Sequence, residues 1–514
     1  MSRIARTAIG LMFVTMIAKI LGFARELVLA SAYGTSSYSD AYLAALNIPN
    51  VIFSIIGIGL TTTFIPIYYE IINDFGEKEG LKFTNNVFNI VTIICIAIST
   101  IGIICAEDLV RAFALGFEGE TFELTLNFTR IFMLGLIFIG VNNIMTSYLQ
   151  IKGNFLIPGL ITVPCNIIVI TSILLSTKYG LNIMGYGTLI GTIGQFLFLI
   201  PFAYKHEYRF KIFLNLKDKY IKKMLFLVGP VLIGVAVNQI NVMVDKTIAS
   251  TLVEGSISAL NYSNRLNLFV TGLFITSISS VIYPMLSKLY CEDNKDKFID
   301  SVVKSINSIV LLVIPISIGA IVLANPIVEI LFKRGAFDER ATQMTSTALV
   351  FYSIGMIGFG LREILGKIFY SLKDTKTPMI NGSVSMIMNI ALNIFLVKFM
   401  GYSGLAFATS ISGIICTMLL FRSLKKKIGY FGQKIIIEVA FKSILASFIM
   451  GVITYVTHQL LSNMLIEGFI YDAISLLTSI SIGFLVYIML VFLFKIKEVR
   501  VLLELLRKKL KKIA

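Results

Sequence analysis

The stretch TAIGLMFVTMIAKILGFARELVLASA, residues 7–32, indicates both the class of the protein and where its function is to be sought. It is mostly apolar and exceeds the roughly 20 residues with which a helix crosses a bilayer core of about 30 Å. Lys19, Arg25 and Glu26 nevertheless lie inside it. A charge near the bilayer centre costs roughly 2.5–3.5 kcal/mol on insertion scales, so such residues normally face a bundle interior or a water-filled cavity. These residues are therefore candidate functional residues, and the excess of cations favours an anionic cargo.

The rest of the chain repeats this apolar pattern. Of its 514 residues, 56% are hydrophobic and only 14% are charged. We predict an all-α, polytopic integral membrane protein, because helices satisfy their own backbone hydrogen bonds in lipid. Fourteen transmembrane helices are expected, at residues 7–32, 41–69, 84–106, 124–149, 155–177, 183–204, 224–252, 256–286, 301–332, 342–370, 378–398, 402–421, 435–458 and 470–494.

The net charge of +16 predicts a membrane topology rather than nucleic-acid binding. Most of the 45 Lys and Arg residues fall in segments on the N-terminal side of the membrane. The positive-inside rule then puts both termini in the cytoplasm. These basic segments also suit contact with anionic lipids of the inner leaflet.

The chain contains an internal repeat. An offset of 218 aligns residues 64–67 (FIPI) with 282–285 (IYPM), and an offset of 220 aligns Pro158 with Pro378. Each repeat holds six expected helices, so both have the same orientation in the membrane. The predicted parts are a six-helix bundle at 1–204, a basic cytoplasmic linker at 205–223, a second six-helix bundle at 224–421, two extra helices at 435–494 and a basic amphipathic tail at 495–514.

Polar residues concentrate in the first two helices of each repeat. Arg25 lies in the outer half of its helix, and Arg265 is expected at a similar level. Two planar guanidinium groups suit a phosphate or pyrophosphate, which they can bind through paired hydrogen bonds. The alternative is internal salt bridging, of Arg25 with Glu26 or Asp40 and of Arg265 with Asp245.

A second polar group lies later in the chain. Asn389 and Asn393 are four residues apart on one helix face, and Thr409 follows on the next helix. Together with Asp245, their oxygens would suit a hard monovalent cation, although such residues also join membrane helices by hydrogen bonds. No phosphate-binding loop, histidine-rich metal motif or nucleophile elbow is present, so we do not expect an enzyme.

Several runs resemble one known family over nearly the whole chain. They are GFARE (22–26), YG (33–34), SDAY (39–42), IPN (48–50), FIP (64–66), LFKRGAFD (331–338) and DTKTP (374–378). These runs resemble the MurJ (MviN) family of the multidrug/oligosaccharidyl-lipid/polysaccharide exporter superfamily. The resemblance implies a lipid II flippase of the bacterial inner membrane, with an undecaprenyl-pyrophosphate-linked peptidoglycan precursor as cargo. It also implies alternating access, a lipid-tail groove formed by the last two helices, and cell-wall synthesis proteins as partners.

The resemblance assigns roles by motif position. Arg25 and Arg265 match cationic residues of the family's cavity, and Lys19 stands where many members have Arg. Asp40 matches the family acid, and Asn50 belongs to the substrate-side motif.

A sodium site, the one cofactor that the resemblance suggests, falls on the second polar group. It would comprise Asp245, Asn389, Asn393 and Thr409, with Asn393 in place of an expected acid.

One departure leaves the cargo open. Phe53 and Ser54 occupy positions where the family usually has arginine, and Ile58 precedes Gly59 where Glu is usual. The chain could therefore be a divergent lipid II flippase or a flippase for another polyprenyl-linked glycan. A drug or cation antiporter of the same superfamily would favour an acidic cavity, and a non-transporting scaffold would use its charges only as structural pairs.

Overall fold

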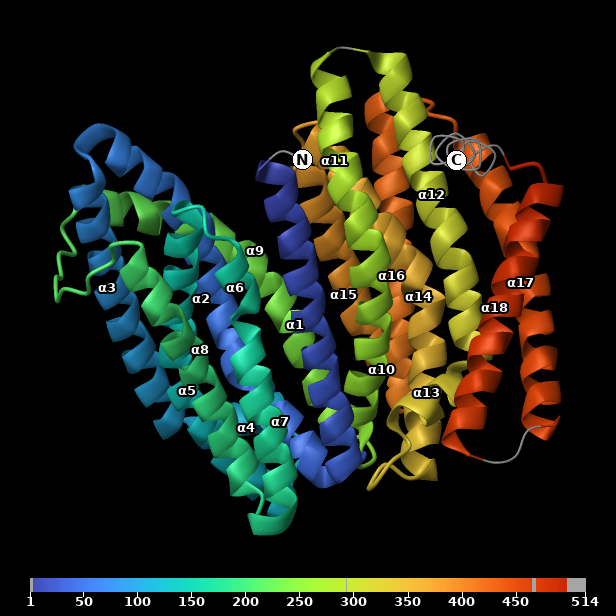
Figure 1. Ribbon diagram of the computed structural model, residues 1–514, viewed down its shortest axis with the longest axis horizontal. Coiled ribbons are helices and arrows are strands. Elements are labelled where there is room, and N and C mark those ends of the chain that lie inside the picture. The colour runs from blue at the N-terminus through green and yellow to red at the C-terminus, as the bar shows by residue number, and fades with distance from the viewer. Residues whose placement is uncertain (1–2, 293, 465–467, 497–514) are drawn as a thin grey trace. The chain divides into compact units, whose positions relative to one another are not determined.

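The computed structural model describes residues 3–292, 294–464 and 468–496, and within these ranges it contains helices and no strand (Figure 1). Twelve of the described helices are long and apolar enough to cross a membrane. Two more helices, α1 (Arg3–Tyr33) and α9 (Lys219–Ser250), have 31 and 32 residues. At 1.5 Å per residue each is about 46–48 Å long, which also suffices for a crossing. The all-α membrane fold is confirmed, and the count of fourteen spans stays a prediction.

The first compact unit comprises Met1–Ser258 and Arg334–Phe337. Besides α1 and α9 it contains α2 (Ser37–Phe75), α3 (Glu77–Ile104), α4 (Ala106–Phe113), α5 (Gly119–Ile151), α6 (Leu156–Leu160), α7 (Thr162–Tyr179) and α8 (Asn182–Lys205). Its apolar core lies between α2, α3, α5, α8 and α9 and includes the aromatic residues Phe64, Tyr68 and Tyr148.

The second unit comprises Ala259–Lys333 and Asp338–Ala514. Its helices are α10 (Ser256–Val270), whose first turn to Ser258 belongs to the first unit, a π-helical turn (Thr271–Ile275), α11 (Thr276–Cys291), α12 (Lys295–Val322), α13 (Ala324–Phe332), α14 (Glu339–Ser371), α15 (Lys376–Met400), α16 (Tyr402–Ile428), α17 (Gln433–Met464) and α18 (Phe469–Leu493). Its core is built mainly by α11, α12, α14, α16 and α17. The predicted amphipathic tail lies almost wholly outside the described residues.

The internal repeat reappears in the helix boundaries. Glu77 begins α3 and Lys295 begins α12, 218 positions later; Gly119 begins α5 and Glu339 begins α14, 220 positions later. The compact units and the sequence repeats nevertheless assign α9 to different halves of the chain. By sequence α9 corresponds to α1, but it packs along α2 within the first unit. The domain boundaries drawn from the repeat therefore stay a prediction.

Three expected helices are interrupted: 155–177 at Ile161, 256–286 by the π-helical turn, and 301–332 at Leu323. The span predicted at 301–332 consists of α12 and α13, which are separated at Leu323. Pro326 lies in the first turn of α13. Proline has no backbone N–H and clashes with the carbonyl four residues earlier, here that of Val322, so a continuous helix is disfavoured. The chain instead restarts with a hydrogen bond from the Ile327 amide to the Leu323 carbonyl.

Candidate functional site

The charged residues of α1 form the first part of the site. Arg25 Nη2 donates to Glu26 Oε1 at 2.9 Å, and the Glu26 side chain is only 3% exposed. Of the two expected partners, Glu26 therefore makes this ion pair with Arg25. Lys19 is exposed and lies seven residues from Glu26, on the same face of α1. The helix thus carries two cations and one buried carboxylate within two turns.

Asp40 is buried near the start of α2 and serves the start of another helix. Its Oδ2 accepts a hydrogen bond from the Gly255 amide at 2.8 Å, and its Oδ1 accepts one from the Ser258 amide at 2.7 Å. These amides belong to the N-terminus of α10, where backbone N–H groups have no partner within the helix and favour a negative charge. Asp40 thus acts as a cap for α10, and its predicted role in substrate binding is not tested by these contacts.

In return, a residue just before α10 caps the N-terminus of α2. The Ser37 amide, at the N-terminus of α2, donates to Glu254 Oε1 at 2.7 Å. Gly255 directly follows Glu254 in the chain. It has φ +89°, and a Cβ there would overlap the Thr35 carbonyl. Sequence reasoning missed Glu254, and the only signal was an acidic residue followed by glycine just before a predicted helix.

Two of the family-like motifs meet at the end of α1. The Ala336 amide donates to the Ser31 carbonyl at 2.8 Å. Gly34 has φ +57°, and a Cβ there would overlap the Ala336 carbonyl; a Cβ on Gly335 would overlap the Ser31 carbonyl. The GA pair of 335–336 therefore fits closely against the YG pair of 33–34. Within the second unit, hydrogen bonds from the Lys333 ammonium to Glu329 and Glu339 raise the pKa of Lys333.

The remaining residues predicted for the substrate are placed as follows. Asn50 is exposed on α2, and Arg265 is exposed on α10 in the second unit. Arg25 lies in the first unit, so a common level of the two arginines stays a prediction. Phe53 is buried in the core of the first unit, with its ring against Gly57 and near Gly140. The family's arginine position is therefore filled by an apolar side chain facing the α2–α5 contact.

Three of the four residues predicted for the ion site lie together. Asn389 Nδ2 donates to Thr409 Oγ1 at 3.5 Å, and Asn393 Nδ2 donates to Asn389 Oδ1 at 3.3 Å. Asn389 and Asn393 are 3% and 0% exposed. Their donor set of neutral oxygens fits the chemistry of a hard monovalent cation. The fourth residue, Asp245, is half-buried on α9 of the first unit.

An apolar groove of about 560 Å³ lies in the second unit, between α12, α14, α16 and α17. One wall is formed by α17 through Ile436, Ile437, Ala440 and Ile444, and the lining residues are almost all apolar. In the described parts of the chain, no group of three or more His, Cys, Asp or Glu residues could hold a metal ion.

The family model described as lipid II flippase MurJ matches residues 29–498. The chain belongs to the MurJ family of lipid II flippases. It is 32% identical over 442 residues to a probable lipid II flippase MurJ of Vibrio cholerae, covering 82% of this chain and 83% of that protein. It is 31% identical over 429 residues to a probable lipid II flippase MurJ of Buchnera aphidicola, covering 82% and 83%.

Solved structures agree with membership in the MurJ family. A lipid II flippase MurJ in an inward closed conformation superposes with a TM-score of 0.78 at 29% identity, covering 94% of this chain and 98% of that chain. An inward-facing multidrug resistance transporter of the MATE family superposes with a TM-score of 0.68 at 14% identity, covering 83% and 99%. The second likeness shows that this chain shares the fold of that MATE family transporter. The chain is thus a multi-span membrane transporter of the MurJ family, with a part in cell-wall precursor transport.

Proposed function

We propose that this chain moves lipid II from the cytoplasmic to the outer leaflet of the bacterial inner membrane. Both termini would lie in the cytoplasm, as the distribution of Lys and Arg predicts. The observation that carries the proposal is the Arg25–Glu26 pair in the membrane helix α1 of a MurJ family member. A half-buried cation paired with a neighbouring buried carboxylate is suited to exchanging that partner for an anionic headgroup.

Arg25 would bind the pyrophosphate, with Lys19 and Arg265 as further cations and Asn50 as a hydrogen-bonding residue. The planar guanidinium can form two parallel hydrogen bonds to phosphate oxygens, which its contact with Glu26 through Nη2 does not provide. Asp40 would act by holding the start of α10. Cargo binding would thus break the Arg25–Glu26 ion pair on α1, and rocking of the two halves would follow from this change.

Asn389, Asn393, Thr409 and Asp245 would hold sodium, which would supply positive charge to drive the return step. The movement of one charge through 100 mV is worth about 2.3 kcal/mol, enough to bias such a step. We expect sodium to stabilise the purified chain against thermal unfolding relative to choline, and Thr409→Val to reduce this difference. An equal effect of both salts on the wild-type chain would contradict the ion proposal.

The polyprenyl tail would remain in lipid while the headgroup crosses. The apolar groove along α17 supports this part of the proposal, because its lining offers almost no polar group to the tail. Cell-wall synthesis proteins are proposed partners that would consume the flipped precursor.

Transport by purified chain in vesicles that contain labelled lipid II tests the cargo-binding role. Arg25→Ala should abolish transport, whereas Arg111→Ala, which breaks an exposed Arg–Glu pair on α4, should leave it unchanged. The double variant Arg25→Gln/Glu26→Gln separates function from folding, because it removes both charges of the pair together. Wild-type transport by a folded double variant would overturn the assignment.

A second cargo is favoured by one observation. The buried ring of Phe53 stands where a family arginine is usual, so fewer cations are available on α2. Native mass spectrometry with lipid II and other polyprenyl-pyrophosphate glycans in competition would decide between them. Preferential binding of another glycan would replace lipid II as the proposed cargo.

A further inference from the structure

The linker between α8 and α9 is held along α3 by three asparagine side chains. Asn85 Nδ2 donates to the Arg209 carbonyl at 3.0 Å, and Asn85 Oδ1 accepts from the Lys211 amide at 2.9 Å. Asn86 makes the same paired contact with the carbonyl and the amide of Asn215, at 2.9 and 2.8 Å. The linker backbone is thus bound through its own N–H and C=O groups, and the Tyr208 hydroxyl adds one side-chain hydrogen bond to Asn85 Oδ1 at 3.1 Å.

Asn89 binds the turning point of the linker. Its Nδ2 donates to the carbonyls of Lys211 and Phe213, at 2.9 and 3.2 Å. Because Asn89 lies one helical turn beyond Asn85, about 6 Å along α3, the linker runs along α3 to this level and then returns to Asn86. In Figure 1 the same segment appears as the green loop beside α3. The linker is therefore a loop whose two limbs and turn are all bound to α3.

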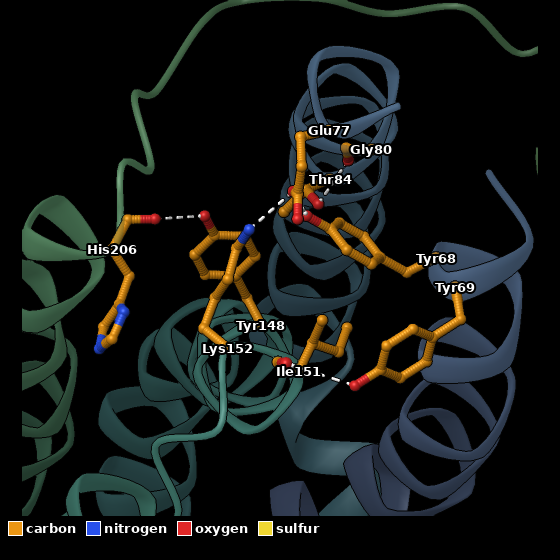
Figure 2. Close-up of polar contacts among 9 residues, drawn as sticks. All are labelled: Tyr68, Tyr69, Glu77, Gly80, Thr84, Tyr148, Ile151, Lys152 and His206. Atoms are coloured by element: carbon orange, nitrogen blue, oxygen red, sulfur yellow. Dashed lines mark hydrogen bonds and ion pairs between the residues drawn. The ribbon is translucent and has the colours of Figure 1, made fainter. Parts of the chain in front are cut away.

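Both ends of this loop are anchored. Tyr148 Oη donates to the His206 carbonyl at 2.7 Å, and Figure 2 shows Tyr148 beside Lys152, which pairs with Glu77 at 2.7 Å. Tyr68 Oη also donates to Glu77, at 2.9 Å, so the ends of α2, α3 and α5 are joined where the loop begins. At the other end, the Asp218 carboxylate accepts hydrogen bonds from the first amides of α9.

The loop presents apolar side chains outward. Phe210, Ile212, Leu214 and Leu216 are 47%, 89%, 51% and 61% exposed. We call these four residues the loop ridge. Exposed cations accompany it, namely Arg209, Lys211 and Lys217. Apolar side chains flanked by cations are the pattern with which a segment inserts into the interface of an anionic membrane.

The sequence of α3 indicates the depth of the loop. The uninterrupted non-charged run of α3, residues 83–104, is about 33 Å long, which just spans a hydrocarbon core of about 30 Å. The three asparagines lie in the first two turns of this run and therefore at one edge of the membrane. Non-helical backbone is tolerated at that depth only where protein groups satisfy it, as the asparagine amides do here.

We propose that residues 206–218 form a re-entrant membrane anchor, whose loop ridge inserts into one leaflet and whose cations bind anionic phospholipid headgroups there. The occupant of this surface is the lipid leaflet itself. The proposal requires only a membrane-spanning chain, so its failure would leave the flippase proposal intact.

The chain contains no Trp, so a single introduced Trp reports on one place only. We would place Ile212→Trp in bilayers of phosphatidylcholine and phosphatidylglycerol with bromine on the acyl chains. Its emission should be blue-shifted and quenched as strongly as that of Ile96→Trp, an exposed position on α3. Quenching should increase with the phosphatidylglycerol fraction.

A water-exposed reference is Glu292→Trp, at the turn between α11 and α12. Emission of Ile212→Trp that matches this reference would overturn the proposal, and would leave a protein partner as the occupant. Quenching that does not depend on phosphatidylglycerol would overturn the headgroup contact.

The asparagine contacts can be tested separately. Asn89→Ala in the Ile212→Trp chain should reduce quenching and increase the rate of tryptic cleavage in the loop. Thr92→Ala is the matched control, because its hydroxyl bonds only within α3. If Asn89→Ala fails to fold, Ile212→Ser removes the deepest side chain instead and should likewise raise the cleavage rate in bilayers. Unchanged cleavage in both variants would overturn the anchoring role of the loop.

Discussion

Asp40 on α2 accepts a hydrogen bond from the Ser258 amide on α10 at 2.7 Å, across 218 positions of sequence. Asp40→Ala would leave this buried amide and that of Gly255 without an acceptor, at about 1–3 kcal/mol per group. We expect thermal unfolding in detergent at a clearly lower temperature, with Glu254→Ala showing a smaller decrease. An Asp40→Ala chain of wild-type stability that cannot transport would instead assign Asp40 to the cargo.

The effects of substitutions at Arg25 and Glu26 on the free energy of unfolding should not be additive. Arg25→Ala removes the cation beside a carboxylate that is 3% exposed, and breaking such a pair costs about 3–5 kcal/mol. Adding Glu26→Gln should recover much of this loss without restoring transport. Denaturant unfolding of the two single variants and the double variant measures the coupling, and additive effects would show that the pair is not a unit.

Gly34 is predicted to tolerate no side chain. Gly34→Ala combines a left-handed backbone, at φ +57°, with overlap on the Ala336 carbonyl, and such strain alone costs of the order of 1–3 kcal/mol. Gly119 has a similar φ of +54° with nothing within 4 Å of an added Cβ, so Gly119→Ala measures the backbone cost alone. Gly34→Ala should be the more destabilised of the two in thermal unfolding. Equal losses would mean that the contact with 335–336 is not close.

Asp374, in the loop before α15, should make stability fall in acid. Burial acts to raise the pKa of its carboxyl, but hydrogen bonds from Lys427 and Thr377 outweigh burial and lower that pKa to about 2. A lowered pKa stabilises the fold fully above the ordinary value of 3.8, and this contribution is lost as the pH falls through about 2. Asp374→Asn should therefore be less stable than wild type at pH 6, and the difference should shrink at pH 2. A difference that is independent of pH would contradict the assignment.

The sequence predicted the parts of the molecule that follow from hydrophobic length and from neighbours on one helix. The helical class, the Arg25–Glu26 alternative and the proximity of Asn389 to Asn393 all belong to this group. Each depends on a period of 3.6 residues or on an apolar run, which a single sequence displays directly.

The contacts that the sequence did not predict join backbone groups to side chains far away in the chain. The hydrogen bond between Ser37 and Glu254 joins residues 217 positions apart, and the one between Asn86 and Asn215 joins residues 129 positions apart. Such contacts leave no periodic signal, because one partner is an amide or a carbonyl that every residue has. The break at Leu323 could have been found, since Pro326 was visible, but proline alone does not end a membrane helix.

Because α9 packs along α2, the first compact unit extends beyond the first sequence repeat and includes the first helix of the second repeat. During synthesis the sixth helix of the first repeat is complete at Lys205, but α9 ends only at Ser250. At about 5–20 residues per second, the ribosome needs roughly 2–9 s to add the intervening residues. Through the first half of that interval Gly59 of α2 lacks Val228, the residue that packs on it in the finished protein. The first half of the chain thus cannot complete its fold before the second half has begun to emerge, and biogenesis of the two halves is ordered in time by a single helix.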